Sequence, residues 1–110
     1  MTLGSAASGA APGRLTDHEA RQRLEHERES RLMQLRAIDA AGAGQQAADD
    51  LLAAQRASTR RVLKEIDAAF ERLADGTYGS CQGCGKAIPA ERLEILPYTR
   101  HCVNCRRSAA

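Results

Sequence analysis

Residues 81–105 read CQGCGKAIPAERLEILPYTRHCVNC, and this stretch decides how the chain folds. It contains all four cysteines of the sequence, in two C-x-x-C pairs that are separated by residues 85–101. Two residues between cysteines allow one tight turn to place both sulfurs on the same side of a metal ion, and two such turns complete a tetrahedral set of thiolates. The spacing therefore predicts one zinc ion bound by Cys81, Cys84, Cys102 and Cys105.

The predicted zinc ion is structural, because four protein ligands leave no open position for water or substrate. Residues 1–13 lack the basic and apolar runs of a secretory signal, and no stretch is long enough to span a bilayer. These features predict a cytoplasmic protein without a membrane partner, and in a reducing compartment C-x-x-C pairs bind metal rather than form disulfides. Redox sensing through oxidation of the same thiolates stays an alternative.

The residues before the cysteines predict a helical hairpin at 14–75. Residues 14–40 contain no Gly or Pro and mix Arg and Glu with apolar residues, which indicates a long helix. Thr16 and Glu19 have the spacing of a capping box at its start. Its apolar positions are Leu15, Leu24, Leu32, Leu35 and Ile38.

A second helix is predicted over 47–74, after a turn near 41–46 that contains Gly42 and Gly44. Its apolar positions recur at steps of four and three, which is a heptad seam with polar members near the turn. The predicted seam is Ala48, Leu52, Gln55, Thr59, Val62, Ile66, Ala69 and Leu73. The two helices can therefore pack antiparallel, each roughly 40 Å long, with the tightest packing near the cysteines.

The overall prediction is a mainly α chain: a disordered Gly/Ala/Ser-rich tail at 1–13, an antiparallel helical hairpin at 14–75, and a C4 zinc-finger module at 76–110. Only one Phe, two Tyr and no Trp are present, which suits an extended hairpin better than a large core. We expect a monomer, although a heptad seam is also what a homodimeric coiled coil shows.

Charge and side-chain chemistry exclude some function classes. The formal net charge of +2 falls close to zero when four thiolates and one dication are counted, so direct DNA binding is not expected. Weak nucleic-acid binding by Lys86, Arg100, Arg106 and Arg107 stays an alternative. No Ser/His/Asp set, phosphate-binding glycine loop or carboxylate pair with metal-ligand spacing is present, so the sequence does not predict an enzyme.

The run from Phe70 to Arg106 resembles the C4 zinc finger of the DksA/TraR family. The resemblance rests on the lead-in DGTYG at 75–79, the C-x-x-C-G at 81–85, the I-P-x-x-R-L-E at 88–94, the proline at 97 and the closing C-x-x-C. It covers about a third of the chain. The predicted hairpin lies where that family has its coiled coil.

Members of this family are transcription regulators that bind RNA polymerase directly. The resemblance implies that the coiled-coil tip of this protein enters the secondary channel of the polymerase core, with guanosine tetraphosphate as a candidate second partner. The main alternative is a non-enzymatic coiled-coil adaptor or homodimer that the zinc module only caps.

The acidic tip is where the sequence departs from the family pattern. The family carries D-x-x-D-x-A at the tip, and this chain has no such string. The nearest acids are Asp39 before the predicted turn and Asp49 and Asp50 after it, and they are the candidate partner-binding residues. The same three residues are also what solvated helix ends commonly contain.

Overall fold

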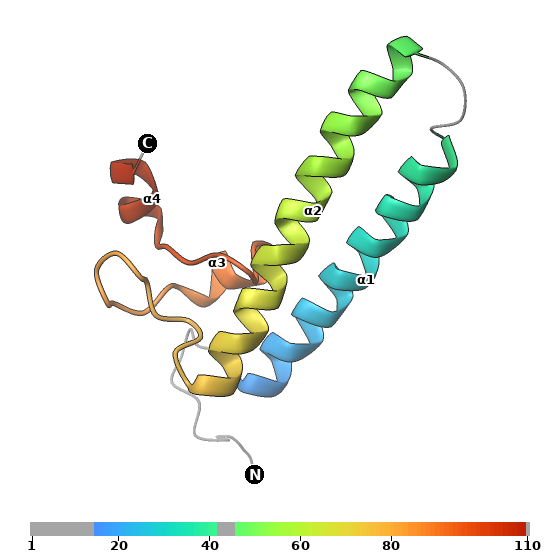
Figure 1. The fold of residues 1–110 in the computed structure, drawn as a ribbon. Helices are drawn as coiled ribbons and strands as arrows, with labels where there is room; N and C mark the ends of the chain where they lie inside the picture. Colours follow the sequence, from blue (N-terminus) through green and yellow to red (C-terminus); the bar gives the residue numbers. More distant parts are fainter. Residues whose placement is uncertain (1–14, 42–45, 110) are drawn as a thin grey trace.

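The computed structural model describes residues 15–41 and 46–109. In this part of the chain, two long helices are followed by two short ones: α1 (Asp17–Ala41), α2 (Gln46–Asp75), α3 (Ala90–Ile95) and α4 (Val103–Ala109). Figure 1 shows α1 and α2 side by side as an antiparallel hairpin, with α3, α4 and the loops around them gathered against one end. The molecule is elongated, with principal extents of 60 × 35 × 22 Å. The predicted fold class, a helical hairpin with a small cysteine-rich module, is confirmed.

Two parts of the sequence prediction lie outside the described residues. They are the tail at 1–13 and most of the turn at 41–46, including Gly42 and Gly44. The predicted second helix at 47–74 agrees closely with the observed α2.

The start of α1 is fixed by the predicted capping box. The backbone N–H of Thr16 donates to Oε1 of Glu19 at 2.9 Å, and the backbone N–H of Glu19 donates to Oγ1 of Thr16 at 3.1 Å. These reciprocal bonds satisfy two amides that have no partner within the helix. The helix therefore begins after Thr16, and Leu15, which was predicted to lie within the helix, precedes it and packs against the cysteine module.

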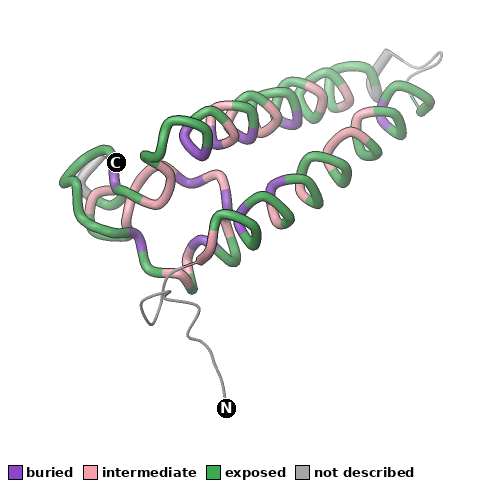
Figure 2. The backbone as a smooth tube through the Cα atoms, turned by 90° about the horizontal axis from the view of Figure 1, so that it is seen from below, coloured by how far each residue is buried: buried purple, intermediate pink, exposed green. Residues whose placement is uncertain are grey.

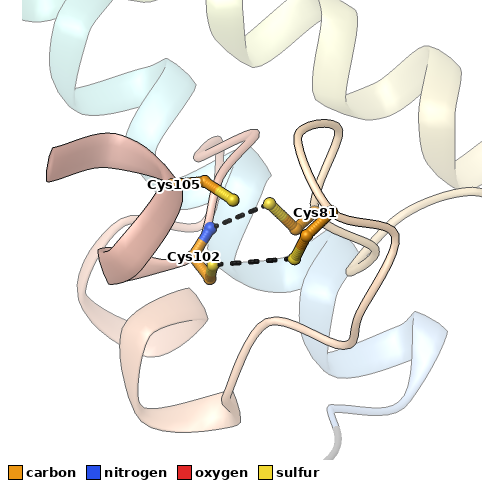
Figure 3. A group of neighbouring side chains, drawn as sticks. Cys81, Cys102 and Cys105 are labelled. Atoms are coloured by element: carbon orange, nitrogen blue, oxygen red, sulfur yellow. Dashed lines mark hydrogen bonds between the residues drawn. The ribbon is translucent and has the colours of Figure 1, made fainter. Parts of the chain in front are cut away.

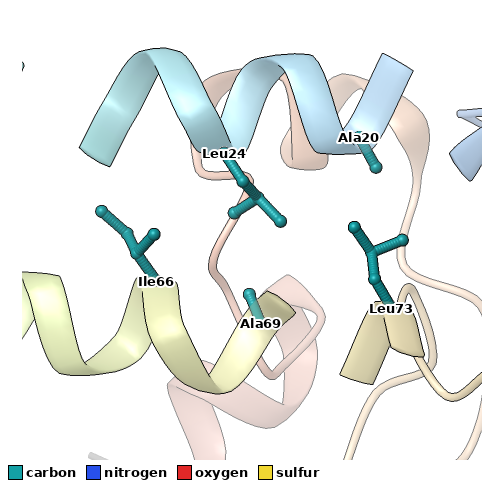
Figure 4. Close-up of a cluster of buried hydrophobic side chains, with 5 residues drawn as sticks. All are labelled: Ala20, Leu24, Ile66, Ala69 and Leu73. Atoms are coloured by element: carbon teal, nitrogen blue, oxygen red, sulfur yellow. The ribbon is translucent and has the colours of Figure 1, made fainter. Parts of the chain in front are cut away.

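The hairpin is held together mainly at its base, the end that carries the module. Five side chains form a buried cluster there, with Leu24 and Ile66 inaccessible to solvent (Figure 4). The cluster consists of Ala20, Leu24, Ile66, Ala69 and Leu73. Fully burying side chains of this size contributes roughly 1.5–3 kcal/mol for each large residue, so this end supplies most of the packing energy.

Packing weakens toward the turn, as the polar members of the seam predicted. From the base cluster toward the turn, the described side chains of the hairpin that are buried are Ile38 and Thr59, while Leu52 is half-buried. Gln55 was predicted to lie in the seam but is exposed, because an amide has no apolar partner to gain there. Figure 2 shows the exposed residues dominating the outer faces of both helices. The side chain of Ala48 lies outside the described residues.

Two interhelical ion pairs supplement the packing. Arg28 lies 3.5 Å from Asp67 and places its guanidinium 6.0 Å from the centre of the Phe70 ring. Nearer the turn, Nε of Arg56 donates to Asp39 at 2.8 Å. Such exposed pairs contribute only about 0–1 kcal/mol each, so they align the helices more than they stabilise them.

At the base, α2 is followed by a glycine with a left-handed backbone conformation. Gly76 has φ 84°, and the amides of Thr77 and Tyr78 both donate to the carbonyl of Arg72, at 2.9 and 3.1 Å. Glycine adopts this conformation without a Cβ clash, which suits its place just past the helix. The chain thereby turns away from the hairpin and enters the cysteine module.

Candidate metal centre

The first cysteine pair lies in a tight loop closed by a single antiparallel bridge between Ser80 and Ala87. Within the loop, the amide of Cys81 donates to Lys86 O and the amide of Gly85 donates to Cys81 O, both at 2.8 Å. Gly85 has φ 76°, so it is needed for backbone conformation. This loop turns the side chains of Cys81 and Cys84 to the same side.

The second pair lies at the start of α4. Cys102 directly precedes the helix and Cys105 lies in its first turn, where Arg106 N donates to Cys102 O at 3.0 Å. The amide of Gln82 donates to the carbonyl of Arg100 at 2.8 Å, which holds the two cysteine pairs side by side. Cys81 and Cys102, which are 21 positions apart in the chain, are in this way brought together.

The four sulfurs are positioned to bind one metal ion. The Sγ atoms of Cys81, Cys84, Cys102 and Cys105 all lie within 4.8 Å of one another, and those of Cys84 and Cys102 are 3.9 Å apart. Four sulfurs at about 2.3 Å from a tetrahedral zinc ion would be about 3.8 Å from each other, whereas a disulfide needs about 2.0 Å. The arrangement fits a zinc ion, and Figure 3 shows three of these cysteines facing a common centre.

Backbone amides prepare the site for negative charge. The amides of Cys102 and Gly83 each donate to Sγ of Cys81 at 3.3 Å. The amide of Cys102 is the main cause that lowers the pKa of Cys81 to about 6. The pKa of Cys105 is raised to about 12, mainly because its thiol shares hydrogen bonds with Cys81 and then with the other two sulfurs. A dication bound here would displace the protons of these thiols.

Gly83 is required for a different reason from Gly85. A Cβ added at Gly83 would lie 3.0 Å from Sγ of Cys105 and 3.1 Å from its Cβ. No side chain fits between the first loop and the start of α4 without moving the sulfur. A side chain at position 83 would therefore crowd the sulfur of Cys105, whereas the space around Gly85 is open.

A second apolar cluster packs against the cysteine side chains. Cys81, Ile88 and Leu93 are buried together, and Leu15 and Tyr78 pack against them. Tyr78 also packs against the cluster at the hairpin base, and its hydroxyl donates to Pro97 O at 2.7 Å. Burial raises the pKa of Tyr78 to about 12. Tyr78 therefore packs between the module and the hairpin.

Several charged residues have roles that the sequence did not reveal. Arg72 is buried in α2 and contacts the module, and Nε of Arg100 donates to Glu65 at 2.6 Å. Both contacts join residues 26 to 35 positions apart, so no helical periodicity signals them. Nε of Arg92 donates to the carbonyl of His101 at 3.0 Å, which makes Arg92 part of the module's framework.

The predicted tip acids are placed differently from one another. Asp39, near the end of α1, accepts a hydrogen bond from Nε of Arg56. Asp49 and Asp50 are exposed near the start of α2 and make no ion pair with the described residues. Only the latter two therefore present unneutralised carboxylates at this end.

Comparison with known proteins follows the same division between module and hairpin. Residues 76–109 match the model of the prokaryotic dksA/traR C4-type zinc finger. The chain carries a DksA/TraR C4-type zinc finger. The resemblance found in the sequence and the predicted single structural zinc ion are thereby confirmed.

Relatives of this zinc finger include general stress protein 16O of Bacillus subtilis, which is 45% identical over 47 residues, covering 43% of this chain and 29% of that protein. The RNA polymerase-binding transcription factor DksA of Escherichia coli is 32% identical over 50 residues, covering 46% of this chain and 33% of the factor. These matches span about a third of the curated relatives.

The likeness to a solved structure extends beyond the zinc finger. Transcription factor DksA2 from Pseudomonas aeruginosa is 28% identical, with a TM-score of 0.54, over 81% of this chain and 74% of that one. Coverage of this extent includes the hairpin as well as the DksA/TraR-type zinc finger. None of the helices in the described part of the chain has the length and apolar character that crossing a membrane requires.

Proposed function

We propose that this protein is a DksA-like transcription regulator that binds RNA polymerase core directly and inserts the turn end of its hairpin into the secondary channel. Cys81, Cys84, Cys102 and Cys105 hold one structural zinc ion in the module at 76–110, which supports the hairpin at 14–75. The observation that carries the proposal is the hairpin itself: a rod packed firmly at its base and polar toward its turn, in a chain similar to DksA2 over 81% of its length.

The shape suits insertion into a narrow channel. The helices of the hairpin run roughly 40 Å from the zinc module, so the turn end can reach deep while the module stays outside. The apolar faces of α1 and α2 pack against each other at the base, so this part of the seam is not available to a second copy. We therefore propose a monomer, and the adaptor or homodimer alternative predicts instead a dimer in light scattering.

Within the tip, Asp49 and Asp50 are the residues proposed to act on the partner. Their carboxylates are exposed and unpaired within the described part of the chain, whereas Asp39 is partly neutralised by Arg56. Changing both to asparagine should abolish the transcriptional effect and leave polymerase binding within about twofold, because exposed substitutions rarely alter folding. The matched control is Glu71→Gln, an exposed carboxylate near the base of α2.

A groove between α2 and the module is the candidate site for guanosine tetraphosphate. It has a volume of ≈ 630 Å³, and its lining includes the exposed cations Arg61, Lys64 and Arg106. Glu65, the one acid among its described lining residues, pairs with Arg100. This pair also removes Arg100 from the basic patch that would bind nucleic acid. Calorimetric titration of the zinc-loaded protein, alone and on polymerase, tests the nucleotide as a partner.

Site-specific photo-crosslinking tests the proposed insertion. Position 43, in the predicted turn, lies outside the described residues, so we choose Ala41, which is the exposed last residue of α1. Glu25 is the control because it is exposed on α1 and makes no hydrogen bond or ion pair with the described residues. A crosslinker at Ala41 should label the catalytic subunits of polymerase core, and one at Glu25 should not.

The outcomes separate the two functions. Labelling from Ala41 that an established secondary-channel factor displaces would support insertion. Absence of labelling from zinc-loaded, folded protein would favour the coiled-coil adaptor. The similarity to the DksA/TraR zinc finger would then extend to the fold but not to the function.

A further inference from the structure

Residues 97–101, which we call the connecting segment, lead directly into Cys102 and are held at every carbonyl. Tyr78 donates to Pro97 O, Gln82 to Arg100 O, and Arg92 to His101 O. The remaining two carbonyls, those of Tyr98 and Thr99, accept from Arg72. A segment without helix or strand is thus fixed as completely as one within regular structure.

Two of the groups that hold this segment come from α2 of the hairpin. Nη2 of Arg72 lies 3.3 Å from Tyr98 O and 3.4 Å from Thr99 O. About two helical turns before Arg72, Glu65 accepts a hydrogen bond from Nε of Arg100 at 2.6 Å. The connecting segment is therefore joined at one end to the base of the hairpin and at the other to a cysteine whose amide donates to Sγ of Cys81.

Arg72 is an unusual residue to find at this junction. It is 6% exposed, its Nη1 atom is buried with no hydrogen-bond partner, and burial lowers the pKa of its guanidinium. Removing a charge from water costs more than two bonds to neutral carbonyls return. A buried arginine is explained better by the position it imposes on the two carbonyls than by the energy it contributes.

We propose that Arg72 is a positioning residue that couples the metal centre to the hairpin: by holding the carbonyls of Tyr98 and Thr99, it makes the order of the base of α2 depend on the metal at the four cysteines. Ordering Cys102 around a metal ion orders the connecting segment, and the ordered segment supplies the carbonyls that the buried guanidinium needs. Without the metal, Arg72 loses its partners and the base of α2 loosens. The coupling does not depend on which partner the hairpin binds.

Hydrogen exchange with and without zinc measures this coupling directly in the full chain. In the unchanged protein, chelation should speed amide exchange across residues 62–73 by roughly tenfold, the effect of losing about one charge-assisted hydrogen bond. Arg72→Met keeps the length and apolar stem of the side chain and removes its donors. In that variant, the effect of chelation on exchange across residues 62–73 should be clearly smaller than in the unchanged protein, with the remainder carried by the packing of Tyr78 and the Glu65–Arg100 pair.

Cobalt substitution shows whether each variant still forms the metal centre. Arg72→Met should retain the thiolate-to-cobalt absorption bands, because Arg72 contacts none of the sulfurs. Arg60→Met is the matched control, since Arg60 is exposed on α2 and has no partner among the described residues. It should keep the full response to zinc, and Arg72→Lys should keep part of it.

Two results would overturn the proposal. One is an Arg72→Met protein whose exchange responds to chelation as strongly as that of the unchanged protein. The other requires no variant: if chelation leaves exchange across 62–73 unaltered in the unchanged protein, the metal centre and the hairpin are independent, whether or not Arg72→Met folds.

Discussion

At the scale of single residues, the two glycines of the first cysteine loop meet different demands. Gly85 needs its left-handed backbone, with φ 76°, while Gly83 needs the absence of a side chain beside Cys105. Both are recognisable in the sequence as glycines next to a cysteine, yet only the structure distinguishes a conformational requirement from a steric one.

Gly83→Ala should weaken zinc binding by roughly ten- to hundredfold, because the new methyl group must displace Sγ of Cys105, 3.0 Å away. Competition against a chromophoric chelator measures the affinity. Lys86→Ala, an exposed change in the same loop, should leave the affinity unaltered. An equal affinity for Gly83→Ala and the unchanged protein would show that the loop can move away from α4.

The capping box at the start of α1 makes that end sensitive to acid. Hydrogen bonding from the Thr16 amide, and then from its side chain, lowers the pKa of Glu19 below its ordinary value of 4.5. A lowered folded pKa means that the stabilisation is present above the pKa of the unfolded chain and is lost as pH falls through the folded value. Carbon-13 NMR of the Glu19 carboxyl should therefore give a midpoint below 4.5. Thr16→Val should raise this midpoint, and an unchanged midpoint would contradict the cap.

The four cysteines and the capping box could be predicted from the sequence because each depends on residues a few positions apart, within one turn. Arg72 could not, since its burial depends on carbonyls 26 positions later. The pairing of Asp39 with Arg56 was missed for the same reason, and it changes which tip acids are free. Local spacing thus predicts the candidate metal ligands, while long-range contacts decide how charged residues are used.

At the scale of secondary-structure elements, the heptad seam predicted which side of α2 would be buried from Thr59 to Leu73, but not where the packing would end. A polar residue in a seam can be buried, as Thr59 is, or exposed, as Gln55 is. The difference depends on the opposite helix, because a small hydroxyl fits beside α1 where an amide does not.

Ile66→Ala should lower the free energy of unfolding by about 3 kcal/mol, because it removes the centre of the base cluster and leaves a cavity. Leu51→Ala on the same helix should change it by less than about 0.5 kcal/mol, since Leu51 is 62% exposed. Urea unfolding of zinc-loaded protein, followed by circular dichroism, measures both. Similar losses for the two variants would mean that packing energy is spread along the hairpin.

At the scale of the whole molecule, the zinc module and the hairpin share a boundary but have different sources of stability. The base cluster is a conventional apolar core, whereas the module has three buried side chains in its own cluster, one of which is Cys81. So small a core cannot offset the entropy of ordering residues 76–109, and the metal must supply the difference.

Chelation should therefore abolish the near-ultraviolet dichroism of Tyr78 and Tyr98, which pack at the boundary, while most helical signal in the far ultraviolet remains. The remaining signal comes from α1 and α2, which contain 25 and 30 residues. Loss of both signals in one transition would show that the hairpin cannot fold without the module. Persistence of the tyrosine signal would show that the module needs no metal.

The concentration of packing at the base also has an evolutionary consequence. Because little of the folding energy resides near the turn, mutations can accumulate there without threatening the fold, and that end can diversify while the rest stays constrained. A chimera that receives the turn of a relative on this base should fold as well as the parent. Regulators built in this way can acquire new effects on an old partner by exchanging a few surface residues at the free end.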